Sequence, residues 1–326
     1  MKYSKHQIIQ FLVCIIILEC SFTFVNGVAH EEAISCGSSH TCYIDTNGDL
    51  NCQGENESYE QAPLKATAQG SFIQVSSAMT HTCAVVENDP SAVEAGMVRC
   101  WGKNDNQEAP FRKTRSDHPI TIYEQVTAGP GGHTCGLVSN GDVECWGSNF
   151  AGAAPGTISG PFSQVSAGTY HTCGLLSNNN VKCWGSNWFG QAPPSIEGGN
   201  HLQVSSGFHH SCALYVNGSV FCFGENNEQQ CDTPPVTDTG TYEQITASGY
   251  HTCALKSDLL GVVCWGDNTY GQAPEANSTN SYTSVLPPAG HKFKSISGGA
   301  THSCAYVTDL SDVFVRKQCW GWNTSE

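Results

Sequence analysis

Charged side chains are scarce in this sequence, and basic ones are the scarcest. Only 13% of the 326 residues are Asp, Glu, Lys or Arg, and 14 basic against 29 acidic side chains give a formal net charge of −15. A general nucleic-acid binder needs basic side chains to displace phosphate counterions, so this charge argues against that class. Disorder is excluded as well, because 39% of the residues are hydrophobic and 13 Phe, 11 Tyr and 7 Trp can build a core.

The chain also lacks long apolar segments, helical periodicity and the short motifs of common enzymes. Its apolar run at residues 8–18 is interrupted by Gln10 and is too short to cross a bilayer, which takes about 20 residues. No segment after residue 27 shows the 3.6-residue period of a helix. A Gly-x-Ser-x-Gly elbow, a P-loop, a His-Glu-x-x-His motif and a calcium loop are all missing, so we expect neither a cofactor nor a metal.

The amino terminus has the layout of a secretory signal peptide. Lys2 and Lys5 precede the apolar run, Glu19 ends it, and Val25-Asn26-Gly27 places small residues before a cleavage point. We therefore expect residues 1–27 to be removed and the mature protein to be secreted without a membrane span; an uncleaved anchor is the alternative. Four Asn-x-Ser/Thr sequons suit this route and are candidate glycosylation sites: Asn56, Asn217, Asn277 and Asn323.

Cysteine is abundant, and its spacing is periodic. Eighteen cysteines are too many for a reducing cytosol unless they bind metal. A His-x-Cys element recurs seven times, each time followed by Cys-x-Gly-x-Asn, and successive first cysteines lie 41, 52, 38, 39, 41 and 51 residues apart. Repeats of this length, with about four short strands each, are typical of a β-propeller. The cysteines of the pattern are Cys42, Cys52, Cys83, Cys100, Cys135, Cys145, Cys173, Cys183, Cys212, Cys222, Cys253, Cys264, Cys304 and Cys319.

The two cysteines of a repeat flank a predicted hairpin. Cys135 and Cys145 are centred on Asn140, and a three-residue loop with Gly141 in the left-handed position places them opposite one another, within reach of a disulfide. The alternative is a zinc site, since His and Cys two residues apart share a strand face. Three ligands per repeat fall short of the four that structural zinc prefers, so the disulfide is favoured. Cys36 and Cys231 lie outside the pattern, and their state stays open.

The repeated phrases His-Thr-Cys-Ala-Leu and Val-x-Cys-Trp-Gly-x-Asn-x-x-Gly-Gln resemble the regulator of chromosome condensation repeat over residues 34–323. This resemblance implies an all-β, seven-bladed propeller, formed by residues 28–326 as a single domain. The paired cysteines resemble those of secreted members, such as the ectodomains of crinkly-type plant receptor kinases, which implies one disulfide per blade. No further strand follows the seventh Trp-Gly, so either residues 29–34 complete that blade or the ring closes imperfectly.

Sites of function should lie where the repeats differ. Because strands alternate in direction, the loop before each repeat His and the loop after each Trp-Gly should emerge on one face. Aromatic side chains in these loops predict a binding rim, with Tyr270 as a weaker member and packing against neighbouring loops as the alternative. The candidate rim residues are Phe150, Tyr170, Trp188, Phe189, Phe208, His209 and Tyr250. The seven repeat His and the repeat Trp are interpreted as parts of the scaffold.

The leading hypothesis is a secreted binding module for an extracellular protein, peptide or glycan. One alternative is an enzyme with a site in the propeller mouth, with His209 as the candidate base because it lies outside the repeat pattern. Another is an extracellular structural protein that self-associates through an open seventh blade. The oligomeric state is left undetermined. Asn56 and Asn323 occupy the turn-stabilising Asn of the repeat, so glycans are expected first at Asn217 and Asn277.

Overall fold

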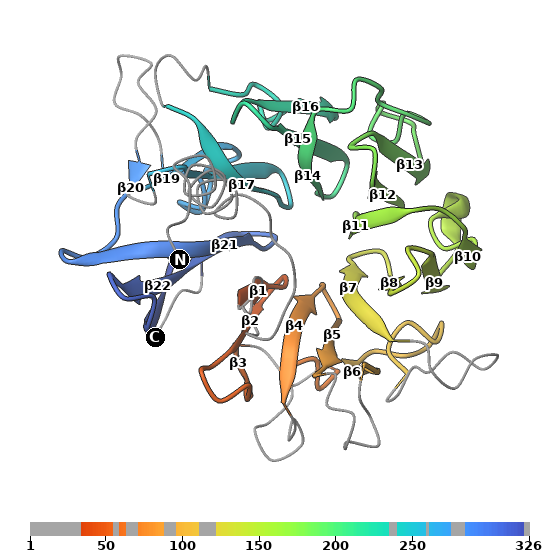
Figure 1. Cartoon of the computed structure of the whole chain (residues 1–326), viewed down its shortest axis with the longest axis horizontal. Helices are drawn as coiled ribbons and strands as arrows, with labels where there is room; N and C mark the ends of the chain where they lie inside the picture. Colours follow the sequence, from red (N-terminus) through yellow and green to blue (C-terminus); the bar gives the residue numbers. More distant parts are fainter. Residues whose placement is uncertain are drawn as a thin grey trace, which may run out of the picture.

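Each sequence repeat folds into one antiparallel sheet, and seven such sheets stand as blades around a common centre (Figure 1). The structure is a computed structural model that describes residues 34–54, 59–62, 71–87, 96–110, 122–234, 240–258, 261–274 and 284–322. The predicted signal peptide at residues 1–27 and the sequons at Asn56, Asn277 and Asn323 lie outside these described residues. The all-β, seven-bladed propeller predicted from the repeats is confirmed.

Three strands form the common frame of a blade. The inner strands are β1 (Ile34–Cys36), β4 (Phe72–Ser77), β7 (Tyr123–Gly129), β11 (Phe162–Ala167), β14 (His201–Ser206), β17 (Tyr242–Ala247) and β21 (His291–Gly298). The middle strands all begin at the repeat His: β2 (His40–Ile44), β5 (His81–Val86), β8 (His133–Val138), β12 (His171–Leu176), β15 (His210–Tyr215), β18 (His251–Lys256) and β22 (His302–Asp309). The outer strands all end at the repeat Gly: β3 (Leu50–Gly54), β6 (Val98–Gly102), β9 (Val143–Gly147), β13 (Val181–Gly185), β16 (Val220–Gly224), β19 (Val262–Gly266) and β23 (Phe314–Gly321).

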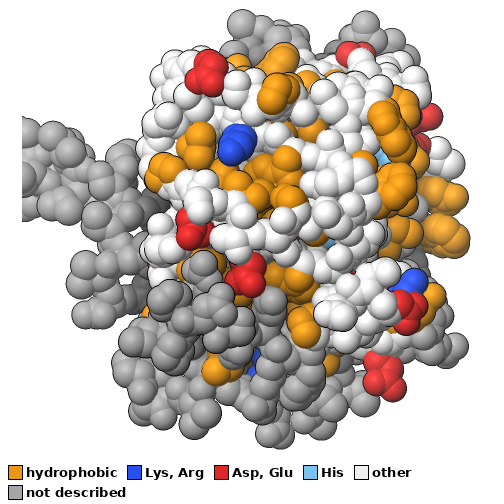
Figure 2. Space-filling model, turned by 90° about the vertical axis from the view of Figure 1, so that its right-hand side faces the viewer, with side chains coloured by type: hydrophobic (Ala, Val, Ile, Leu, Met, Phe, Trp, Pro, Cys, Tyr) orange, Lys and Arg blue, Asp and Glu red, His pale blue; other side chains and the backbone are white. Residues whose placement is uncertain are grey.

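Among the described residues, two blades carry a fourth strand on the outside of this frame. β10 (Thr157–Ile158) pairs with β9, and β20 (Ser284–Val285) pairs with β19. A short 3-10 turn at Phe150–Gly152 precedes β10. Charged side chains are thinly spread over the described surface in Figure 2, in keeping with the composition.

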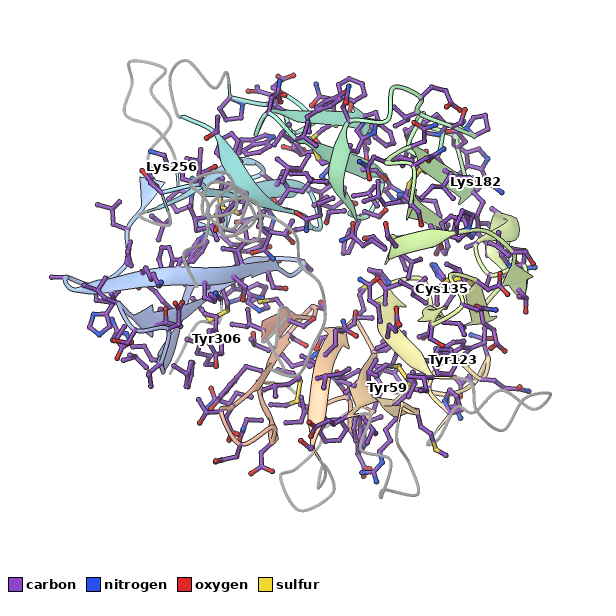
Figure 3. The ribbon with its side chains drawn as sticks, viewed as in Figure 1. Tyr59, Tyr123, Cys135, Lys182, Lys256 and Tyr306 are labelled. Carbon is purple, nitrogen blue, oxygen red and sulfur yellow. A yellow bond between two sulfur atoms is a disulfide. The ribbon has the colours of Figure 1, made fainter. Side chains whose placement is uncertain are left out.

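The hairpin between the middle and outer strands places the paired cysteines opposite one another. In blade three Cys135 is in register with Cys145, and Gly141 has φ of 86°, the left-handed conformation that the loop requires. Asn179 takes this conformation in blade four with φ of 62°. All seven predicted disulfides are present, one in each blade, with S–S distances of 2.02–2.10 Å (Figure 3). Among the described residues, Cys36 and Cys231 are free thiols.

The repeat His joins every blade to the next. Each of the seven Nε2 atoms lies 2.7–3.1 Å from a Thr or Ser hydroxyl of the following blade, from His40 with Thr82 round to His302 with Thr41. At four interfaces this hydroxyl donates its own hydrogen to a loop carbonyl, so it must accept the N–H of the imidazole. Burial lowers the pKa of these His side chains to about 3 or 4, which keeps them neutral. The repeat His is therefore part of the scaffold.

A second ring of hydrogen bonds runs closer to the centre. One Ser or Thr hydroxyl on each inner strand accepts a backbone N–H of the neighbouring inner strand at 2.8–3.1 Å, from Ser35 with Ser77 round to Ser297 with Cys36. Because both rings return from the seventh blade to the first, the propeller is closed. Ile34 begins the inner strand of blade one, so it does not complete blade seven as an outer strand, and residues 29–33 of that prediction lie outside the described residues.

Apolar packing is concentrated between the blades. Each interface has its own buried cluster, in which the disulfide of one blade meets apolar residues of the next. Trp265 is typical: its ring lies in such a cluster, and its Nε1–H donates to the Gln230 carbonyl at 2.9 Å. The predicted interblade packing of the repeat Trp is confirmed. At the interface between blades seven and one, which we call the seam, exposed Gln53 holds the Trp position and Phe314 packs between Tyr43 and Tyr306.

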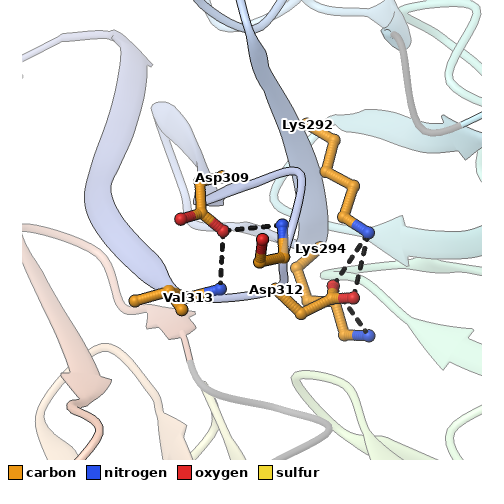
Figure 4. Close-up of polar contacts among 6 residues, drawn as sticks. Lys292, Lys294, Asp309, Asp312 and Val313 are labelled. Carbon is orange, nitrogen blue, oxygen red and sulfur yellow. Dashed lines mark hydrogen bonds and ion pairs between the residues drawn. The ribbon is translucent and has the colours of Figure 1, made fainter.

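The hairpin of blade seven is held by carboxylates (Figure 4). Asp309 accepts the backbone N–H groups of Ser311 and Val313 at 2.8 and 3.0 Å, which closes the turn. Asp312 pairs with Lys292 at 3.0 Å and with Lys294 at 3.5 Å, so it ties the turn to β21. The hydrogen bond from Lys292 is the main reason that the pKa of Asp312 lies below its usual value.

Candidate functional site: an aromatic ladder across four blade interfaces

Two sets of loops emerge together on one face of the propeller. In blades two to seven, the residue after the repeat Gly donates its backbone N–H to the carbonyl of the residue before the repeat His. Ser186 donates to Tyr170 at 2.7 Å, and Glu225 donates to His209 at 2.9 Å. The loops that carry the candidate rim residues are therefore bonded to each other, as the strand directions predicted. We call this side of the disc the aromatic face.

The repeat Asn shapes the loops that follow the outer strands. Asn187 accepts the backbone N–H of Ala192 at 2.9 Å, and Gly190 between them has φ of 83°. The same Asn contact recurs at Asn104, Asn149, Asn226 and Asn268, at 2.8–3.1 Å. A fixed loop of this kind holds the residues at its tip, here Trp188 and Phe189, away from the sheet.

The candidate rim residues contact one another across blade interfaces. Phe150 of blade three packs on Tyr170 of blade four at 4.7 Å between ring centroids, and also on Trp188 at 5.9 Å. Phe189 packs on His209 of blade five at 5.4 Å. Phe208 packs on Tyr250 of blade six at 5.5 Å. Every one of the seven residues thus belongs to an aromatic contact, and each interface from blade three to blade six has one.

These contacts leave much of the aromatic surface open to solvent. Trp188 is 72% exposed, Phe150 49%, Phe189 47% and Tyr250 38%, whereas Tyr170, Phe208 and His209 are partly buried. The partly buried rings support the exposed ones. Packing between loops therefore describes some of these rings, and a surface open to solvent describes the others. Figure 2 looks at the edge of the disc near β10 and β13, and apolar side chains gather along its right-hand margin.

Sequence reasoning missed one further contact of the same kind. Tyr270 of blade six stacks on Trp322 of blade seven, with centroids 4.9 Å apart and ring planes 14° from parallel. Trp322 directly follows the repeat Gly, where other repeats have a small or charged residue, and that substitution was the available signal. We call the row of contacts from Phe150 to Trp322 the aromatic ladder. It consists of the seven candidate rim residues together with Tyr270 and Trp322, and it crosses four successive blade interfaces.

A polar cavity lies at the centre of the ring. Its volume is about 160 Å³, and the inner strands and the loops that follow them line it. Phe208 contributes both to the cavity lining and to the aromatic ladder, so the cavity extends to the loops of the aromatic face. The Gln and hydroxyl side chains of the inner strands are held by interblade hydrogen bonds, such as that from Ile245 N–H to Gln203 at 2.7 Å. They form a rigid polar lining.

The geometry adds no support for two alternatives, catalysis with His209 as a base and metal binding by cysteine and histidine. Among the described residues, the ring of His209 contacts Phe189 and forms no hydrogen bond with a carboxylate, so a role as a base stays a prediction. Cys36, His302 and Cys304 have ligand atoms within 4.8 Å of one another, but Cys304 is bonded to Cys319 and offers no thiolate to a metal.

Comparison with known proteins agrees with the repeat pattern. A profile of the regulator of chromosome condensation (RCC1) repeat matches residues 32–60, 123–153, 162–191, 202–230 and 242–272. The protein carries RCC1 repeats. Its described residues contain no helix with the length and apolar character that crossing a membrane demands.

Solved structures share this RCC1-type propeller. The CRINKLY ectodomain of the Arabidopsis thaliana receptor kinase ACR4 matches with a TM-score of 0.66 and 20% identity, covering 89% of this chain and 95% of that one. The ectodomain of the Physcomitrella patens receptor kinase CR4 gives 0.65 and 22%, covering 89% and 72%. Prp20p of Saccharomyces cerevisiae, described with its binding to Gsp1p and histones, gives 0.63 and 18%, covering 86% and 82%. At identities of 18–22%, this structural similarity establishes the fold alone.

A curated relative also matches part of the RCC1-repeat chain. The serine/threonine-protein kinase-like protein CCR2 of Arabidopsis thaliana is 26% identical over an alignment of 124 residues, and the match covers 35% of this chain. The match spans only 16% of that kinase-like protein.

Proposed function

We propose that this protein is a secreted binding module whose aromatic ladder holds an extracellular protein, peptide or glycan. The observation that carries the proposal is the row of interblade aromatic contacts, in which exposed rings rest on partly buried ones. Exposed aromatic side chains grouped on one face are a common feature of binding surfaces, because they bury a large area at low entropic cost.

The rigidity of the scaffold supports a binding role. Disulfides clamp each hairpin, and two closed rings of hydrogen bonds fix the blades relative to one another. A ladder held in this way loses little conformational freedom when a partner binds, and preorganisation raises affinity. The structural likeness to two receptor-kinase ectodomains agrees with an extracellular role.

The shape of the site indicates how a partner would lie. The ladder follows an arc over blades three to seven, and Phe208 is part of both the ladder and the cavity lining. An extended peptide or an oligosaccharide that stacks on the exposed rings can place one polar group over the hydroxyl-lined cavity. Trp188 and Phe150, which are the most exposed of the candidate rings, are expected to be the binding hot spots.

The test uses protein secreted from eukaryotic cells and two defined probe sets, an array of immobilised oligosaccharides and a library of extended peptides. The strongest probe is then titrated against Trp188→Ala, Tyr170→Ala and a control, Phe221→Ala, which removes a ring of similar exposure (45%) from outer strand β16. We expect at least tenfold weaker binding for the two ladder variants and unchanged binding for the control. Equal affinity in all variants would remove the aromatic face from consideration.

A further inference from the structure

The seam differs from the other blade interfaces in two ways. It is the interface at which no stretch of chain leads from one blade to the next, because blade seven comes last in the sequence and blade one comes first. It also has Gln53 in the place where other blades bring a Trp or Phe, and its buried cluster consists of Ile34, Cys36, Cys304 and Tyr306. Within the part of the chain that the structure describes, the ring is therefore closed at its seam by noncovalent contacts alone.

A free thiol lies within this seam beside the disulfide of blade seven. Cys36 is buried on inner strand β1, donates its thiol hydrogen to the Ser297 carbonyl at 3.3 Å, and has its sulfur within 4.8 Å of the Cys304 sulfur. Cys304 is bonded to Cys319 of β23. The hydroxyl of Thr41 touches both sulfurs, at 3.9 Å from Cys36 and 3.8 Å from Cys304.

The geometry points to an alternative disulfide, Cys36–Cys304, that joins the first blade covalently to the last. Cys36 loses its proton, and its sulfur forms a bond with Cys304 while the Cys304–Cys319 bond breaks. Cys319 leaves as a thiolate and takes up a proton. The number of thiols and disulfides is unchanged, so the exchange requires neither an oxidant nor a reductant.

The groups around Cys36 determine how fast this exchange runs. Burial raises the pKa of the Cys36 thiol to about 12, against the opposing effects of the hydroxyl of Thr41 and the cation of Lys317. Burial keeps His302, which lies beside the sulfurs, neutral, and it raises the pKa of Tyr306, in the same buried cluster, to about 12. The attacking species is the thiolate, so exchange in the folded protein is slow near neutral pH and accelerates by about tenfold per pH unit below that pKa.

The second free thiol of the described residues provides a comparison. Cys231 lies in the loop after β16 and donates to the Glu225 carbonyl at 3.4 Å. Among the described residues, its sulfur belongs to no cluster of the kind that Cys36 forms with Cys304 and His302. Cys231 packs on the buried cluster that holds the disulfide of its own blade, Cys212–Cys222, whereas Cys36 lies beside the disulfide of a different blade. Burial raises the pKa of both thiols to about 12.

The exchange can be observed by peptide mapping of the full-length secreted protein. Samples held at pH 6 and pH 9 are quenched with acid, denatured, alkylated and digested with trypsin without reduction. Trypsin cleaves after Lys65, Lys294, Arg316 and Lys317, so Cys36, Cys304 and Cys319 fall in three different peptides. We expect a peptide linked through Cys36 and Cys304, with alkylated Cys319, that accumulates at least a hundredfold faster at pH 9.

Three variants complete the test. Cys36→Ser, which places Ser where Ser77 and Ser206 stand in other blades, should abolish the linked peptide, and Cys231→Ser should leave it unchanged. Cys319→Ser removes the competing partner, so the thiol oxidases of the secretory pathway should oxidise Cys36 and Cys304 to one disulfide. Only the Cys304–Cys319 bond at both pH values in the unmutated protein would overturn the proposal, as would two alkylated thiols in a folded Cys319→Ser variant.

Discussion

His302 in the last blade and Thr41 in the first share a hydrogen bond of 2.9 Å, and this contact completes the ring of seven His interactions. The two residues lie near opposite ends of the chain. Their contact has the same form as that between His40 and Thr82, which belong to consecutive blades at 2.7 Å. The same kind of His–Thr hydrogen bond therefore joins the blades at the seam and the blades that follow one another in the sequence.

Thr41→Val should destabilise the protein by about 1–3 kcal/mol, because the substitution leaves the buried Nε2–H of His302 without an acceptor. Thr82→Val is the matched control, since it removes the acceptor of His40 at an interface that has a chain connection. Denaturant unfolding with the disulfides intact measures both. Similar losses would indicate that the seam is as well closed as the internal interface, and no loss from Thr41→Val would contradict the closed ring.

Stability should fall as the pH is lowered from about 6.5 toward 4. The folded protein holds its repeat His residues neutral, with pKa values of about 3 or 4, while the same side chains in the unfolded chain take up protons near pH 6.5. A depressed folded pKa means that stability is complete above pH 6.5 and is lost on acidification. Each His contributes a slope of at most about 1.4 kcal/mol per pH unit.

Unfolding free energies measured at several pH values between 7 and 4 check this expectation. His133→Gln retains a side-chain donor at one interface and removes one titrating group. The number of protons taken up on unfolding should therefore fall by about one, and the slope of the unfolding free energy against pH should fall with it. A stability that is the same at pH 6.5 and pH 4.5 would show that the repeat His residues titrate alike in both states.

Removing one blade disulfide should cost roughly 2–4 kcal/mol, because the reduced hairpin gains freedom in the unfolded chain. Cys135→Ala combined with Cys145→Ala tests this in blade three, where both cysteines lie in a buried interblade cluster. Part of the loss will come from packing, so the double variant is compared with Cys231→Ala, which removes a sulfur outside any disulfide. Equal thermal midpoints for the two proteins would show that the clamp adds no stability.

Much of this fold could be predicted from the sequence, because the spacing of residues within one repeat determines the strands and the hairpin of a blade. The separation of Cys135 from Cys145 around Asn140 determined the hairpin, the register and the disulfide together. Antiparallel alternation then placed the loops of Tyr170 and Trp188 on one face. Such inferences need only the geometry of a strand and a turn, and seven copies of the pattern supported each of them.

Contacts between blades were less accessible, because they depend on how two sheets meet. Trp322 was recognisable as an unusual residue after the repeat Gly, but spacing does not predict that it stacks on Tyr270, since the partners come from loops of different repeats. The proximity of Cys36 to Cys304 is harder still to predict from the sequence, because it arises only when the last blade meets the first. Cys36 was recognisable as an exception to the repeat, but its neighbour was not.

Asn217 should carry an N-linked glycan in protein that has passed through the secretory pathway. Its side chain is exposed at the turn between β15 and β16, where the amide oxygen accepts the N–H and hydroxyl of Ser219 and no apolar packing covers it. This hairpin emerges on the side of the disc opposite the aromatic face, so a glycan there leaves the ladder free. Mass spectrometry before and after enzymatic deglycosylation, with Asn217→Gln as control, measures occupancy. An unmodified Asn217 in correctly disulfide-bonded, secreted protein would argue that this turn is too tight for the transferase and would shift attention to the remaining sequons.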